Sequence, residues 1–71
     1  MKLHYYAETD SLYIDLTSKP GSETREIVEG LMVDLDDKGH VVGIDIDHAS
    51  QRVELKSLET ISFPALKLKV A

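Results

Sequence analysis

The 71-residue sequence has no cysteine, no tryptophan and only two prolines. Without cysteine, the chain can form neither a disulfide framework nor a thiolate metal site. No apolar run approaches the ~18 residues that cross a membrane, and the first residues lack the apolar core of a signal peptide. We therefore expect a cytoplasmic protein with no membrane segment, and nothing in the sequence indicates a cofactor.

Basic residues are also few. The sequence has 8 lysines and arginines and 13 aspartates and glutamates, which gives a net charge of −5. Such a surface repels phosphate backbones, so nucleic-acid binding by this chain alone is not expected. The charge is unevenly placed, with −7 in residues 1–50 and +2 in residues 51–71. The acidic part favours a basic protein partner.

The length permits one domain, residues 1–71. A chain of this size buries only about 60% of the surface of its unfolded form, so a monomer is marginally stable. With no disulfide or metal to reinforce it, self-association is the remaining means, and we expect a homodimer.

Alternating apolar and polar residues predict a mainly β fold, α+β at the margin: an antiparallel meander of about five or six short strands with one short helix near residues 48–56. Asp47 is the expected N-cap of this helix. Pro64 precedes a last alternating segment, which either covers the sheet or pairs with another subunit as an edge strand. The expected strands are 3–7, 12–16, 23–28, 31–35, 40–46 and 65–70.

Loop lengths predict which residues face each other. A four-residue loop at 8–11 places Tyr5 opposite Ile14, and a second four-residue loop, at 36–39, places Val33 opposite Val42. One side of the sheet then becomes the core. Its expected centre is Tyr5, Leu12, Ile14, Leu16, Val33, Leu35, Val42 and Ile44.

The other side becomes polar, and it holds the candidate catalytic residues. The predicted register places His4 opposite Asp15 and Tyr6 opposite Tyr13, and the turn at Glu29-Gly30 places Arg25 opposite Asp34. A histidine beside a carboxylate can act as a base, and a tyrosine can donate to a developing anion. Ordinary cross-strand pairing on a solvated face explains the same pattern and is the favoured interpretation.

Two groups of acidic residues could hold a metal ion, and each has a simpler explanation. Asp45, Asp47 and His48 could supply ligands for a divalent ion, although acids near the end of a sheet need no ligand. The acids around residues 34–45 partly follow the spacing of a calcium loop, but Lys38 occupies a ligand position. A turn rich in aspartate is the favoured interpretation of that segment.

Residues of the two hairpins and the short helix form a recognisable series. Its members are Tyr6, Glu8, Asp10, Leu12, Tyr13, Ile14, Gly30, Asp34, Gly39, Gly43-Ile44-Asp45-Ile46 and Ala49-Ser50. In order and spacing this series resembles the domain of unknown function 2283 family, whose members are small single-domain prokaryotic proteins. The resemblance covers residues 3 to about 52, a family-like core, and leaves residues 53–71 as a C-terminal extension. The resemblance implies no recorded activity, although family members resemble the acidic partners of toxin–antitoxin-like modules.

Two functions are therefore open. The first is a non-catalytic protein–protein interaction module, in which the acidic residues attract a small basic protein, as an antitoxin-like partner would. The alternative is a small hydrolase or metal-dependent enzyme that uses the His/Asp/Tyr cluster of the polar side. We favour the first, because so short a chain struggles to build a concave pocket.

Overall fold

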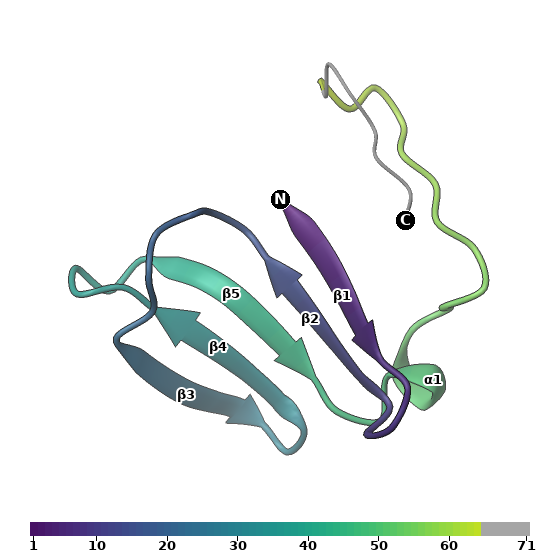
Figure 1. The fold of residues 1–71 in the computed structure, drawn as a ribbon, viewed down its shortest axis with the longest axis horizontal. Helices are drawn as coiled ribbons and strands as arrows, with labels where there is room; N and C mark the ends of the chain where they lie inside the picture. The colour runs from purple at the N-terminus through teal and green to yellow at the C-terminus, as the bar shows by residue number, and fades with distance from the viewer. Residues whose placement is uncertain (65–71) are drawn as a thin grey trace.

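The computed structural model describes residues 1–64, and five short strands and one helical turn form its ordered framework (Figure 1). This confirms the predicted mainly β, antiparallel class, while the predicted strand 65–70 lies outside the described residues. No helix within residues 1–64 is long and apolar enough to cross a membrane. The elements are β1 (Lys2–Tyr6), β2 (Ser11–Asp15), β3 (Glu23–Val28), β4 (Leu31–Leu35), β5 (Val41–Ile46) and α1 (Ala49–Arg52).

The strands form one sheet in the order β1-β2-β5-β4-β3, and all neighbours are antiparallel. The hairpin β1–β2 therefore joins the meander β3–β4–β5 along β5. The connection from β2 to β3 passes the ends of β5 and β4 (Figure 1). At these ends the amide of Leu16 donates to the Val42 carbonyl, and the amide of Ser22 donates to the Leu35 carbonyl.

The pairing gives the sheet two chemically different faces, because successive side chains of a strand point to opposite sides. The apolar face consists of Leu3, Tyr5, Leu12, Ile14, Val28, Leu31, Val33, Leu35, Ile44 and Ile46, together with Glu23 and Arg25 of β3. The polar face consists of Lys2, His4, Tyr6, Ser11, Tyr13, Asp15, Thr24, Glu26, Met32, Asp34, Gly43 and Asp45.

The predicted register of the first hairpin is wrong by two residues. Tyr5 pairs with Leu12, where Ile14 was expected, because the loop occupies residues 7–10. Asp10 ends this loop with φ 52°, a left-handed conformation that aspartate tolerates. The β4–β5 pairing is shifted in the same way, with Val33 opposite Ile44. A shift of two residues leaves every side chain on its predicted face.

The core is smaller than predicted. Within the described residues, the buried apolar side chains are Leu12, Leu35, Val42 and Ala49, and no large side chain is fully buried. Tyr5, a predicted core residue, is exposed, and the remaining predicted core residues are half-buried. The reason is that the sheet is a single layer, with no other element of residues 1–64 packed across it.

The predicted helix forms only as α1, which ends at Arg52 because Val53 adopts an extended conformation. Asp47 is not its cap: the preceding residue, His48, has φ 53° and makes no capping side-chain hydrogen bond. The cap comes from Asp10, whose carboxylate accepts hydrogen bonds from the Ser50 amide at 3.0 Å and the Ser50 hydroxyl at 2.7 Å. A carboxylate from a distant turn thus satisfies a free amide of the first helical turn.

Asp10 therefore connects the first hairpin to α1. Its backbone carbonyl also accepts the Ala49 amide at 2.9 Å, and its carboxylate accepts the Tyr5 hydroxyl at 2.9 Å. The hydrogen bonds from Ser50 and Tyr5 lower the pKa of Asp10. A lowered pKa means that this carboxylate stabilises the fold when it is ionised.

We predict that Asp10→Ala lowers the urea midpoint of unfolding, and that Asp10→Asn lowers it less because the amide oxygen still accepts one hydrogen bond. The contribution of Asp10 is present above its unfolded pKa of 3.8 and is lost as the pH falls through the lower folded value. Urea titrations from neutral to acidic pH measure this. If both variants and the wild type lose stability equally in acid, the proposed role of the Asp10 carboxylate is wrong.

Candidate functional site

Tyr13 is at the centre of the polar face. Its side chain leaves β2, crosses β5 above Gly43, and donates its hydroxyl proton to Asp34 Oδ2 on β4 at 2.7 Å. A Cβ atom at position 43 would lie 1.9 Å from the Tyr13 hydroxyl oxygen and 2.6 Å from Cζ. Glycine is required at this position because only a missing side chain leaves room for the ring.

Both oxygens of Asp34 accept a hydrogen bond. Tyr13 occupies Oδ2, and the hydroxyl of Thr24 on β3 donates to Oδ1 at 2.7 Å. Thr24 lies directly opposite Asp34 in the β3–β4 pair. The polar network therefore spans four adjacent strands, from β2 to β3.

Carboxylates surround the Tyr13 hydroxyl. The hydrogen bond to Asp34 raises the pKa of Tyr13 to about 12, and burial and the negative charges of Asp34, Asp15 and Asp45 add to the effect. All of these influences favour the neutral phenol. Tyr13 is consequently a fixed hydrogen-bond donor at neutral pH and is poorly suited to accept or release a proton.

Asp45 lies beside Tyr13 in the β2–β5 pair and opposite Met32 in the β4–β5 pair. Partial burial raises its pKa, and the nearby charges of Asp47 and Asp34 raise it further. Its ionised form is therefore disfavoured in the fold. The protein becomes less stable as the pH rises through the folded pKa of Asp45 and this carboxylate ionises. A cation placed beside Asp45 would remove that penalty.

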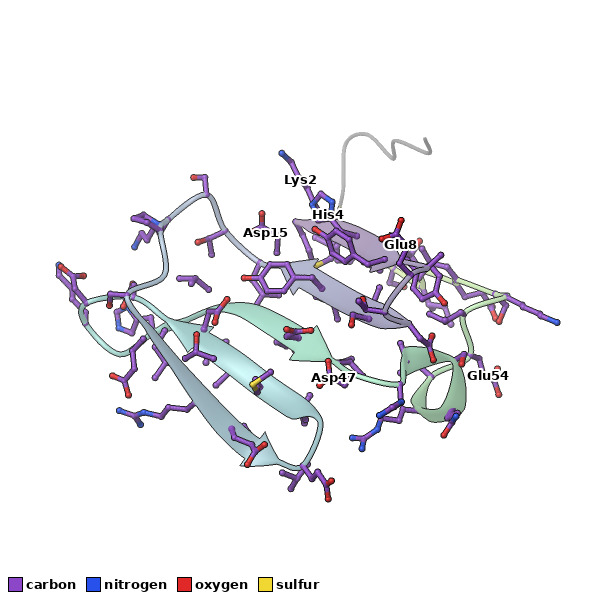
Figure 2. The ribbon with its side chains drawn as sticks, turned by 60° about the horizontal axis from the view of Figure 1, so that its bottom comes forward. Lys2, His4, Glu8, Asp15, Asp47 and Glu54 are labelled. Carbon is purple, nitrogen blue, oxygen red and sulfur yellow. The ribbon has the colours of Figure 1, made fainter. Side chains whose placement is uncertain are left out.

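His4 and Tyr6 occupy the polar face of β1, as predicted, but not with their predicted partners. His4 lies opposite Tyr13 and Tyr6 opposite Ser11, whereas Asp15 lies opposite Lys2. The His4 and Tyr6 rings stack on each other with centroids 6.4 Å apart, and both are exposed. Figure 2 shows Lys2, His4 and Asp15 on the same side of the sheet.

Arg25 is not part of this face, and its predicted pairing with Asp34 is wrong. The register shifts between Glu26 and Val28, so Arg25 lies opposite Val33 on the other side of the sheet. When the pairing is counted back from the turn at Glu29-Gly30, a one-residue bulge moves each side chain beyond it to the opposite face. Arg25 instead forms an ion pair with Glu23 of its own strand.

The predicted metal ligands occupy the end of β5. Asp47 is close enough to Asp45 to raise its pKa, while its amide donates to the Gly30 carbonyl at 2.8 Å. His48 is exposed. Within residues 1–64, no group of three histidine, cysteine, aspartate or glutamate residues is placed to hold a metal ion.

The aspartate-rich turn after β4 has a structural role. Asp36 is buried, and its Oδ1 accepts the amides of Lys38 and His40, each at 2.9 Å. These amides and the nearby His40 ring lower its pKa. The carboxylate therefore closes its own turn, as the sequence-based interpretation favoured.

Sequence reasoning missed three residues of this framework: Thr24, Gly43 and Asp10. Thr24 and Gly43 act through neighbours on adjacent strands, and only a correct register would have revealed them. Asp10 acts on Ser50, 40 residues later. The one local signal was glycine in the middle of a strand, which often marks a close approach by another group.

The matched residues of a known family coincide with this framework. A family model described as "Protein of unknown function (DUF2283)" matches residues 2–50, from the start of β1 to the residue that Asp10 holds. The chain belongs to this family. The predicted resemblance to this family is thereby confirmed. Comparisons with curated proteins and with solved structures gave no match.

Tyr13, Asp34 and Gly43 all lie within the DUF2283 match. From their geometry we predict that Gly43→Ala destabilises the protein by about 1–3 kcal/mol, because the added methyl displaces the Tyr13 ring. In a double-mutant cycle with Tyr13→Ala, the cost of Gly43→Ala should become much smaller. Urea unfolding of the four proteins measures this. Additive effects would show that the Tyr13 ring does not press on position 43.

We also predict that Tyr13 titrates near pH 12 and that Asp34→Asn moves this pKa back toward the ordinary value of 10.0. The stability that the neutral phenol provides is present below pH 10 and is lost as the pH rises through 12. Ultraviolet absorbance of the phenolate measures the titration, and Tyr13→Phe identifies its signal. An unchanged pKa in Asp34→Asn would contradict the assigned cause.

Proposed function

We propose that this protein is a non-catalytic protein–protein interaction module whose polar face binds a basic protein, as the antitoxin-like partner of a small two-protein pair would. The observation that supports this most is the arrangement of a single sheet layer with one acidic face and one apolar face, neither covered by another described element. A one-layer sheet is an incomplete domain, since stable domains pack at least two layers.

The charges of the polar face favour a cationic partner. Across the five strands it carries four carboxylates and one lysine. No lysine, arginine or histidine within residues 1–64 forms an ion pair with Asp15, Asp34 or Asp45. A lysine or arginine from a partner, seated near Tyr13, would meet all three carboxylates and relieve the raised pKa of Asp45.

The enzyme alternative has less support from the geometry. Two surface depressions, of about 470 and 360 Å³, are lined by residues of the loops at 19–22 and 36–38 and the adjoining strand ends. Asp34 lines the second depression, but neither depression is lined by His4, Tyr6 or Tyr13. The histidine and tyrosines of the predicted catalytic cluster thus stand on an open sheet surface and not in a concave pocket, which substrate binding normally requires.

We predict that the tagged full chain captures a basic protein from its native cells at low salt and releases it as salt rises, because exposed charges are screened. The double variant Asp15→Asn/Asp45→Asn should weaken binding of that purified protein by at least about tenfold. Isothermal titration calorimetry at low and high salt measures the affinities.

A matched control removes two charges elsewhere. Asp37→Asn/Glu54→Gln changes the net charge by the same amount at exposed positions outside the polar face (Glu54 in Figure 2). It should leave the affinity nearly unchanged. Equal weakening by both pairs, or failure to capture any basic protein at any salt concentration, would overturn the proposal.

A further inference from the structure

The apolar face is open across all five strands. Leu3 on β1 is 46% exposed and Val28 on β3 is 55% exposed, although these strands form opposite edges of the sheet. The central residues of this face, such as Ile14 and Ile44, are only half-buried. α1, the only helix among the described residues, has four residues and lies at one end of the sheet (Figure 1).

The exposed area is large enough for a stable interface. The chain exposes 6,091 Å², whereas a compact monomer of 7.9 kDa exposes roughly 4,400 Å². The excess, about 1,700 Å², is area that a compact fold of this mass would bury. A standard interface takes about 800 Å² from each partner, so part of this excess suffices.

Charge indicates which partner fits. On this side of the sheet the charged side chains of β3, Glu23 and Arg25, form an ion pair with each other. The apolar face is therefore neutral, although the chain carries −5. Two copies can approach through this face without repulsion, whereas their acidic polar faces repel each other. A basic partner gains no electrostatic attraction there.

We infer that two copies of this chain stack apolar face on apolar face and form a two-layer sandwich. Such sheets pack about 10 Å apart, and their inward side chains interdigitate to form the core that a single copy lacks. Leu3, Ile14, Ile44 and Val28 become buried in this arrangement. The inference goes beyond the proposed function, which concerns the polar face, and each stands without the other.

Residues 53–64 are the competing occupant, because they carry exposed apolar side chains of their own. Leu58 is 72% exposed and Ile61 is 82% exposed. In Figure 1 this segment runs from α1 away from the strands and does not cross either face. In the described structure it leaves the apolar face open, and the experiment tests whether it covers that face in solution.

Sedimentation equilibrium of the full chain tests the inference. We expect a mass of twice 7.9 kDa at micromolar concentration, and a thermal midpoint that rises with protein concentration. Leu3→Arg and Val28→Arg, at opposite edges, should each raise the dimer dissociation constant by at least about tenfold. A monomeric wild type overturns the inference.

The matched control is Tyr6→Arg, which places the same charge on the polar face of β1, where Tyr6 is 54% exposed. It should leave the dissociation constant unchanged. Weakening by Tyr6→Arg and Leu3→Arg but not by Val28→Arg would show edge pairing through β1. Dissociation by Ile61→Arg alone would show that residues 53–64 form the contact. Either result overturns the stacked arrangement.

A second measurement covers the case in which the arginine variants unfold. In a mixed dimer of isotope-labelled and unlabelled wild-type chains, isotope-filtered NMR should show intermolecular contacts from the methyl groups of Ile14 and Ile44. These residues lie on the inner strands, so a partner that paired along an edge strand would not contact them. A dimer without such contacts overturns the inference.

Discussion

The packing of Tyr13 across Gly43 onto Asp34 fixes how the two parts of the sheet fit together. Strand pairing joins the hairpin β1–β2 to the meander β3–β4–β5 along the β2–β5 pair. A slip of β2 along β5 would move the Tyr13 ring from the one position that lacks a side chain and break its hydrogen bond to Asp34. With this register set, most apolar residues of the paired strands lie on the same side, and the two faces follow.

The sequence was sufficient for the strands and their faces because alternation survives an even error in register. His4, Tyr6 and Tyr13 were therefore assigned to the correct side although their partners were wrong. The predicted face of Arg25 was wrong because one bulged residue reverses the alternation, and nothing in the local sequence marks that bulge. The predicted cap of α1 was wrong for another reason. Asp47 is the local candidate, but the hydrogen-bond acceptor is Asp10, which is far away in the sequence.

In a single-layer sheet, a small chain can have a defined backbone geometry and still bury little apolar surface. Backbone pairing joins its five strands, and polar side chains such as Asp10, Asp34 and Asp36 fasten its turns and strands. These contacts determine geometry but bury little apolar surface, since no large side chain of residues 1–64 is fully buried. In the proposed dimer, the intermolecular contact supplies the main favourable contribution to folding, which is burial of apolar area.

In the proposed arrangement, the two faces serve different contacts without interfering with each other. If the apolar faces stack, the polar faces point outward on opposite sides of the dimer, separated by two sheets whose planes alone lie about 10 Å apart. This separation exceeds the screening length of about 8 Å at physiological salt, so the acidic groups of one copy hardly repel those of the other. Each polar face then keeps its own negative potential. Self-association and attraction of a basic protein are thus compatible in one small sheet, because alternation places their determinants on opposite sides.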